Sequence, residues 1–138
     1  MPVPPELSNR HIDPKTYPAG VAFMDGQYLP MSEAKISVLD YGLLHSDATY
    51  DVVHVWEGAF FRLQDHLERF FAGLEKLHMS IEYNKVQVTE ILHNCVALSG
   101  LRRSYVEFIC TRGILDDTSG RSRSENLIAI AGIMKYAG

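Results

Sequence analysis

The sequence predicts an α+β domain in which two helices pack on an antiparallel sheet built from hairpins. Two observations support this prediction: short apolar runs joined by two-residue turns outnumber the longer segments, and two longer segments carry apolar residues at helical spacing. With 138 residues and 46% hydrophobic content, the chain can bury one core. We expect a single domain over residues 21–138, preceded by an extended, proline-rich arm over residues 1–20.

Two dipeptides indicate hairpins. Asp25 and Gly26 lie between the apolar runs 21–24 and 27–30, and this pair favours a type I′ turn, which needs positive φ at both central residues. Glu57 and Gly58 similarly separate two strands, expected over residues 50–56 and 59–63. Further strands are expected over residues 36–39, 105–111 and 127–134, with a polar loop over 113–126.

The two helices have start and stop signals of different strength. The first is expected to begin at Asp65, with Glu68 as a variant of the capping box. Its core face comprises Leu67, Phe70, Phe71, Leu74 and Leu77. The second is expected to begin at Asn84, with Gln87 as its capping partner, and to end at Gly100. Its apolar stripe comprises Val88, Ile91, Leu92, Cys95 and Leu98.

Composition excludes several classes of function. The 17 acidic and 13 basic residues give a net charge of -4 without a basic tract, so we expect no nucleic-acid partner. No apolar run has the length of a membrane span and no signal peptide is recognisable, so we expect a cytoplasmic protein that contacts no membrane. The six histidines lack metal-binding spacing, and no metal site is expected. Cys95 and Cys110 are expected to be buried thiols.

Candidate binding residues surround the strand over residues 50–56. Tyr50, Val52 and His54 share one face of this strand by alternation, while Asp51 and its valine neighbours share the other. His45 lies in the loop before the strand. A tyrosine and a histidine beside Val52 would line a mixed polar and apolar pocket. The alternative is that both are buried and hydrogen-bonded to the backbone.

Charged residues elsewhere leave similar alternatives open. Arg69 lies far from the apolar stripe of its helix, and is either a solvated surface residue or an anion clamp. Glu107 shares a strand face with Tyr105, and its carboxylate points to solvent or to a pocket. Arg121 and Arg123 lie in the long polar loop, where an arginine is either solvated or captures a substrate carboxylate.

Several linked motifs carry a family resemblance. In order after the Asp25–Gly26 turn they are residues 32–37 (SEAKIS), 43–50 (LLHSDATY), 61–69 (FRLQDHLER) and 111–113 (TRG). Together they resemble the small N-terminal domain of the fold-type IV, or class IV, pyridoxal-phosphate (PLP) aminotransferases. This group includes branched-chain and D-amino-acid aminotransferases. The run from His45 to Tyr50, followed by His-Val-Trp, is most similar to the (R)-selective amine transaminases, since branched-chain enzymes carry a tyrosine at the position of His45.

The resemblance implies a homodimeric enzyme that uses PLP to move an amino group between an amine or amino acid and a 2-oxo acid. Arg69 matches the arginine that binds the cofactor's phosphate. The positions that match the family's substrate pocket are His45, Tyr50, Val52, Tyr105 and Glu107, with Arg121 or Arg123 as the loop arginine.

The family's Schiff-base lysine lies in a larger C-terminal domain, and none of the lysines in this chain matches it. We therefore expect no catalytic residue here, no transamination by these 138 residues alone, weak PLP binding, and self-association through an exposed apolar face. Two alternatives remain. An enzyme resembling aminodeoxychorismate lyase shares the fold and cofactor, but the His45 and Tyr50 pattern argues against it. A non-catalytic oligomerisation or interaction domain would not need the pocket residues that this chain retains.

Overall fold

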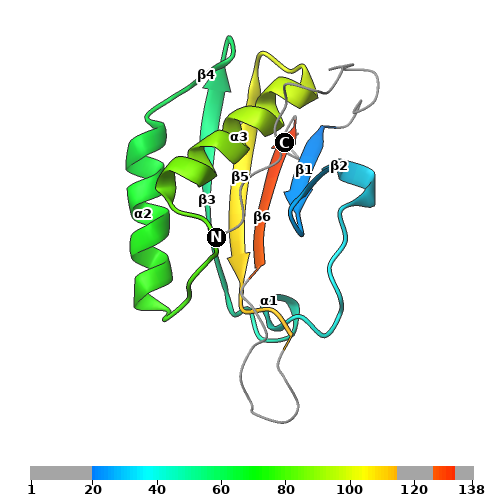
Figure 1. The fold of residues 1–138 in the computed structure, drawn as a ribbon, viewed down its shortest axis with the longest axis vertical. Coiled ribbons are helices and arrows are strands. Elements are labelled where there is room, and N and C mark those ends of the chain that lie inside the picture. The colour runs from blue at the N-terminus through cyan, green and yellow to red at the C-terminus, as the bar shows by residue number, and fades with distance from the viewer. Residues whose placement is uncertain (1–19, 115–125, 133–138) are drawn as a thin grey trace, which may run out of the picture.

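The fold is a six-stranded antiparallel sheet with two long helices, as described by a computed structural model for residues 20–114 and 126–132 (Figure 1). The strand order is β2-β1-β6-β5-β3-β4. The strands are β1 (Val21–Met24), β2 (Gln27–Pro30), β3 (Ala48–Trp56), β4 (Ala59–Phe60), β5 (Ser104–Thr111) and β6 (Asn126–Gly132). The helices are the 3₁₀ turn η2 (Met31–Glu33), α1 (Tyr41–Leu44), α2 (Leu63–Lys76) and α3 (Lys85–Ser99). The predicted α+β class is confirmed.

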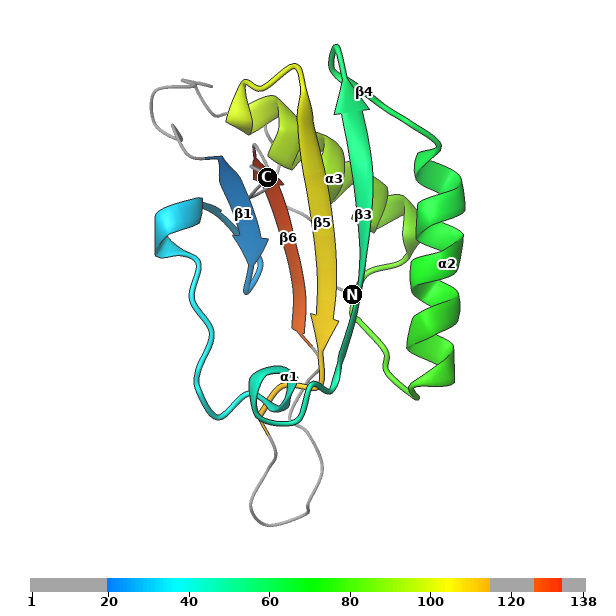
Figure 2. The same ribbon diagram turned by 180° about the vertical axis from the view of Figure 1, so that it is seen from behind.

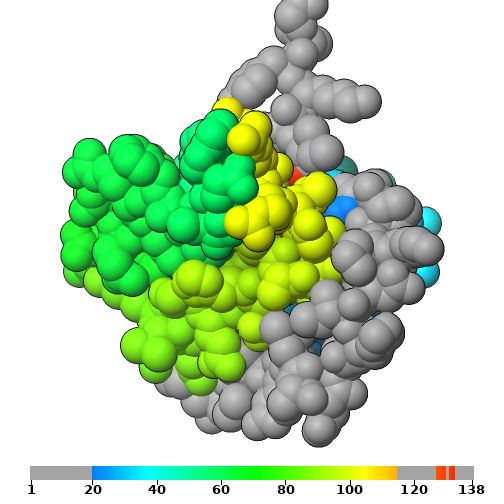
Figure 3. Space-filling view, turned by 90° about the horizontal axis from the view of Figure 1, so that it is seen from above, coloured from blue at the N-terminus to red at the C-terminus, as the bar shows by residue number. Residues whose placement is uncertain are grey.

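Both long helices pack on the same side of the sheet. Helix α3 crosses over β5, β6 and β1, whereas α2 runs along β3 at the sheet edge (Figure 1). Seen from behind, the strands lie in front of both helices (Figure 2). From above, α2, α3 and the turn between β3 and β4 form one close-packed surface (Figure 3). The core therefore lies between the helices and one face of the sheet, where Phe70 of α2 meets Phe108 of β5 edge to face at 4.9 Å.

The strongest local signals are confirmed. Asp25 and Gly26 have φ values of 52° and 74°, as a type I′ turn requires. At the start of α3, the Asn84 side chain accepts from the Gln87 backbone N–H at 2.8 Å, and the Gln87 side chain accepts from the Asn84 N–H at 3.0 Å. Gly100 ends the helix with a φ of 68°. Both cysteines are buried, and burial raises the pKa of the Cys95 thiol.

The predicted start of the first helix is wrong. Helix α2 begins at Leu63, and its N-cap is Arg62, which has a left-handed φ of 57° and no capping side chain. Asp65 lies in the first turn, where its carboxylate accepts from the Arg62 guanidinium at 2.7 Å and therefore does not cap the backbone. Because the chain enters the helix early, the strand expected over residues 59–63 is only Ala59–Phe60.

The strand predicted over residues 36–39 is also wrong. These residues pair with no described strand, and the Val38 side chain is 69% exposed. The chain instead leads into the short helix α1, which the sequence did not predict. Buried Asp40 begins this helix by accepting from the Gly42 N–H at 2.7 Å and from the Thr111 hydroxyl at 2.9 Å. The carboxylate thus ties α1 to the end of β5.

The expected N-terminal arm falls almost wholly outside the described residues, as do most of the polar loop and the last two residues of the final strand predicted over 127–134. In the described part, no helix is long and apolar enough to cross a membrane.

Candidate active site

Strand β3 presents different side chains to its two sides, as the alternation predicted. Asp51 and Val53 are buried on the side of the helices, whereas Tyr50, Val52 and His54 lie on the opposite, open face. The Tyr50 side chain is 64% exposed. The alternative of a buried, backbone-bonded tyrosine is therefore wrong for this chain.

The pairing of β3 with β5 gathers the predicted pocket residues on the open face. Val52 lies opposite Glu107, and His54 lies opposite Tyr105. We call the set Tyr50, Val52, His54, Tyr105 and Glu107 the open-face patch. The rings of His54 and Tyr105 stack with centroids 5.0 Å apart. Glu107 is only half exposed, and this burial raises the pKa of its carboxyl group.

His45 lies beyond the end of β3, on the segment that connects α1 to Tyr50. It is the C-cap of α1 and donates its backbone N–H to the Tyr41 carbonyl at 2.9 Å, while its exposed ring packs edge-on against the Tyr41 ring at 4.6 Å. The same segment contains Asp47, which receives two hydrogen bonds from Arg112, at 2.9 and 3.3 Å. The histidine therefore lies on an anchored loop next to the patch.

Arg69 is not a lone surface arginine. Its Nε donates to Asp51 Oδ2 at 2.7 Å and its Nη2 donates to Oδ1 at 2.9 Å, so that one edge of the guanidinium is paired. The hydrogen bonds and the negative charge of Asp51 raise the pKa of Arg69. The arginine side chain is still 72% exposed, against 3% for Asp51. It is thus anchored at one edge and open to solvent at the rest.

His66 completes the cluster around Asp51. Its Nδ1 lies 2.7 Å from Asp51 Oδ1, a distance that assigns the ring proton to Nδ1 as the donor. Burial raises the pKa of the Asp51 carboxyl, but the hydrogen bonds from Arg69 and His66 outweigh burial and bring it below its usual value. Asp51 is therefore a carboxylate that stays ionised.

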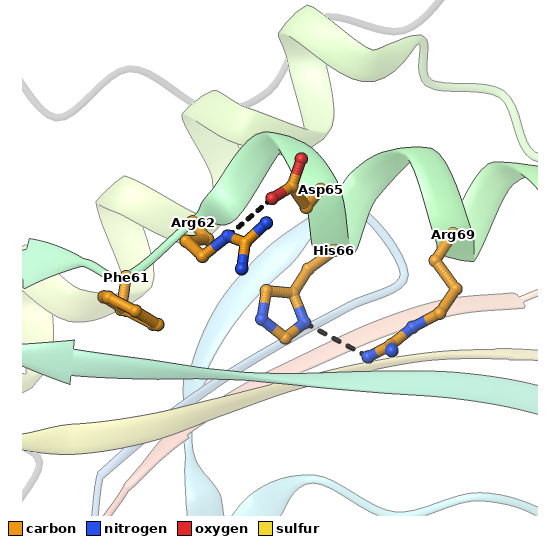
Figure 4. Close-up of a pocket in the computed structure, with 5 residues that line it drawn as sticks. All are labelled: Phe61, Arg62, Asp65, His66 and Arg69. Atoms are coloured by element: carbon orange, nitrogen blue, oxygen red, sulfur yellow. Dashed lines mark hydrogen bonds and ion pairs between the residues drawn. The ribbon is translucent and has the colours of Figure 1, made fainter.

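A hollow of about 280 Å³ lies beside this cluster, at the start of α2 (Figure 4). Its lining consists of Phe61, Arg62, Asp65, His66 and Arg69. Figure 4 shows His66 and Arg69 extending from the same side of α2, with Arg62 paired to Asp65 nearer the start of the helix. An exposed guanidinium in a hollow of this size suits a phosphate group, because a phosphate accepts paired N–H donors.

The structure places Arg69 and the open-face patch on different sides of β3. They meet at an edge, because in the described part of the chain β4 pairs with β3 only at Val55 and Trp56. Beside Tyr50 and Val52, the outer edge of β3 has no described strand as a neighbour. A ligand that crosses this edge can reach both the arginine and the patch. Arg121 and Arg123 lie outside the described residues.

Asp51 and His66 are the members of this cluster that the sequence analysis did not select. One signal was present: Asp51 shares a strand face with Val53 and Val55, and a carboxylate on so apolar a face needs a charged partner. The partner lies 18 residues further on, in a helix. Only the packing of α2 along β3 identifies it.

Comparison with known proteins agrees with this arrangement. A D-alanine aminotransferase of Listeria monocytogenes is 30% identical over 82 residues, which are 59% of this chain and 28% of that protein. A D-alanine aminotransferase of Staphylococcus aureus is 26% identical over 94 residues, which are 68% of this chain and 33% of that protein. The chain thus spans about a third of the length of these relatives.

A solved structure gives the same fold. A branched-chain amino acid aminotransferase from the source abbreviated T.th., solved with pyridoxamine 5′-phosphate, superposes with a TM-score of 0.75 at 26% identity, over 87% of this chain and 42% of that one. The sequence pattern of the family Amino-transferase class IV matches residues 48–136, which is more than half of the chain and includes β3, α2, α3 and β5. The chain belongs to the class IV aminotransferase family.

Proposed function

We propose that the whole protein is a PLP-dependent aminotransferase that moves an amino group between an amine or amino acid and a 2-oxo acid. Residues 21–138 would form its small domain, after an arm over residues 1–20. Family membership supports the reaction class. The observation that carries the proposal is Arg69, an exposed guanidinium that lines a hollow and is anchored at one edge.

The residues of the hollow fit the phosphate of PLP. Arg69 keeps N–H donors beyond those that Asp51 occupies, because a guanidinium carries five. When bound, PLP supplies an electron sink for the bond changes at the amino carbon. The chain's own part would be to bind the phosphate through Arg69 and so fix the position of the cofactor at the edge of β3.

The open-face patch would bind the substrate. Tyr50 and Tyr105 offer hydroxyl groups, Val52 offers apolar contact, and Glu107 offers a carboxyl group with a raised pKa. Together with His45 these groups would orient the amine and exclude water from one side of the reacting carbon. Arg121 or Arg123 would capture a substrate carboxylate.

Three finer points belong to the same proposal. The His45-to-Tyr50 run supports the (R)-selective amine transaminase subgroup. The exposed aromatic residues of the open face support a homodimer, as does the resemblance to dimeric enzymes. A cytoplasmic location agrees with the composition.

Residues 1–138 alone would be inactive and would bind PLP weakly, because no lysine here matches the catalytic one. Their production as a separate polypeptide tests this. Turnover of an amine donor with pyruvate as acceptor would contradict it.

The phosphate role of Arg69 is tested by its replacement with alanine in the full-length protein. We expect Arg69→Ala to weaken PLP binding by about 100-fold, since two charge-assisted hydrogen bonds are lost. Equilibrium dialysis of the apoprotein measures the dissociation constant. Arg62→Ala is the matched control, because Arg62 lines the same hollow but pairs with Asp65. Less than a threefold change for Arg69→Ala, or an equal loss for Arg62→Ala, would remove Arg69 from this role.

A further inference from the structure

We infer that Asp51, assisted by His66, is a positioning residue that holds the Arg69 guanidinium with its second edge available to the phosphate group. This inference rests on the proposed function, because it assigns a purpose to the anchoring of the same arginine. It concerns a carboxylate that itself points away from the open-face patch and is closed off from solvent by the helix that packs on it.

The first step is the difference in mobility between the two partners. Asp51 belongs to a central part of β3, its side chain is almost fully buried, and its Oδ1 accepts from the Val52 N–H at 2.9 Å. Arg69 stands at the surface of α2, and a free arginine side chain there would sample many rotamers. The two hydrogen bonds from the guanidinium to Asp51 therefore fix the arginine to the sheet.

The second step is the number of donors that remain. Asp51 takes the Nε–H and one N–H of Nη2. Both N–H groups of Nη1 and the second N–H of Nη2 have no partner among the described residues, since the contact of Nη2 with His66 Nδ1 is 3.4 Å between two donors. These groups form a second fork on the far edge, whose planar geometry matches two oxygens of a phosphate.

The third step concerns His66. Its Nδ1–H donates to Asp51 Oδ1, which also accepts from Arg69. The imidazole thus stands beside the guanidinium and limits the rotation of the carboxylate about its last bond. Figure 4 shows the ring next to the guanidinium on the same side of α2.

An opposing effect makes the inference testable by sign. Asp51 carries a negative charge near the expected phosphate, so simple Coulomb repulsion predicts that its removal strengthens anion binding. Positioning predicts the reverse. We expect positioning to dominate, because the charge of Asp51 is already compensated by Arg69 and by the N–H groups of His66 and Val52.

The test compares Asp51→Asn with Asp65→Asn in the full-length apoprotein. Both variants remove one negative charge near the hollow, but Asp65 pairs with Arg62 and not with Arg69. Equilibrium dialysis with PLP and with pyridoxal, which lacks the phosphate, separates phosphate binding from everything else. We expect Asp51→Asn to weaken PLP binding by about tenfold without weakening pyridoxal binding, and Asp65→Asn to weaken neither. Tighter PLP binding by Asp51→Asn, or equal weakening of both ligands, would overturn the inference.

A double-mutant cycle with Arg69→Ala distinguishes this inference from the proposed function. If Asp51 acts through Arg69, Asp51→Asn has no further effect on PLP binding once Arg69 is alanine. An undiminished effect in that background would show a merely structural role. If Arg69→Ala itself changes nothing, the proposed function fails instead. Should Asp51→Asn not fold, Asp51→Glu, which keeps a buried carboxylate but shifts it, takes its place in the same cycle with the same criterion.

Discussion

The two faces of the sheet differ sharply although they alternate along the same strands. Toward α2 and α3, strands β3 and β5 present fully buried residues such as Val53, Val106 and Phe108. Toward the open side they present Tyr50 and Glu107, which are exposed or half-exposed. The helix side is apolar except for Asp51, and both oxygens of that carboxylate are hydrogen-bonded. The open side mixes aromatic, aliphatic and acidic groups.

This difference separates stability from chemistry in the molecule. Burial on the helix side removes apolar surface from water, which is the main stabilising contribution to a domain of this size. The open face contributes less to stability, and its residues are therefore free to be selected for binding. Asp51 is the exception, since it lies on the stable side and connects it to an exposed arginine.

The largest expected effect comes from a buried ring. Phe108→Ala should lower the free energy of unfolding by about 3–5 kcal/mol, because it removes a fully buried side chain that packs on Phe70. Tyr105→Ala, on the open face of the same strand, is the matched control and should cost about 1 kcal/mol or less. Urea denaturation of the full-length protein measures both. Similar losses for the two variants would show that the open face is also a structural face.

A smaller effect with opposite signs is expected from the two carboxyl groups. The folded-state pKa of Asp51 is lowered, so its stabilising contribution is present above its ordinary value of 3.8 and is lost as pH falls below that value. The pKa of Glu107 is raised from 4.5, so its ionisation reduces stability as pH rises above that value. Asp51 therefore favours the folded state at neutral pH, and Glu107 favours it at acid pH.

Two variants separate these contributions. Glu107→Gln should increase stability at about pH 7, by under about 1 kcal/mol, and this gain should vanish at about pH 3. Asp51→Asn should decrease stability at about pH 7, by about 1–3 kcal/mol, and should lose less on acidification than the unmodified protein. Urea midpoints at the two pH values provide the measurement. Parallel pH profiles for both variants would contradict the assignment of the two carboxyl groups to different environments.

Local signals explain what the sequence could predict. The turn at Asp25 and Gly26, the capping box of Asn84 and Gln87, and the end of α3 at Gly100 each depend on neighbouring residues alone. The alternation along β3 likewise placed the residues of the open-face patch on one face. These predictions needed no knowledge of the rest of the chain.

The errors arose where a side chain found a partner that competes with its local role. Asp65 would cap a helix in isolation, but it pairs with Arg62, whose left-handed backbone begins α2 two residues earlier. Residues 36–39 have the composition of a strand but lie exposed without a described neighbour. The anchoring of Arg69 was not predictable, because it depends on how α2 packs along β3.

Arg112 has a consequence for how the molecule opens. Besides Asp47, its guanidinium contacts the carbonyl oxygens of Leu77 and His78, at 2.7 and 3.2 Å, where α2 ends. One side chain at the end of β5 thus joins the loop that follows His45 to the last turn of a helix. Neither segment can swing away without breaking the contacts of the other. Their amide hydrogens should therefore exchange with solvent as one cooperative unit, so that the loop beside the patch has the local stability of the helix end.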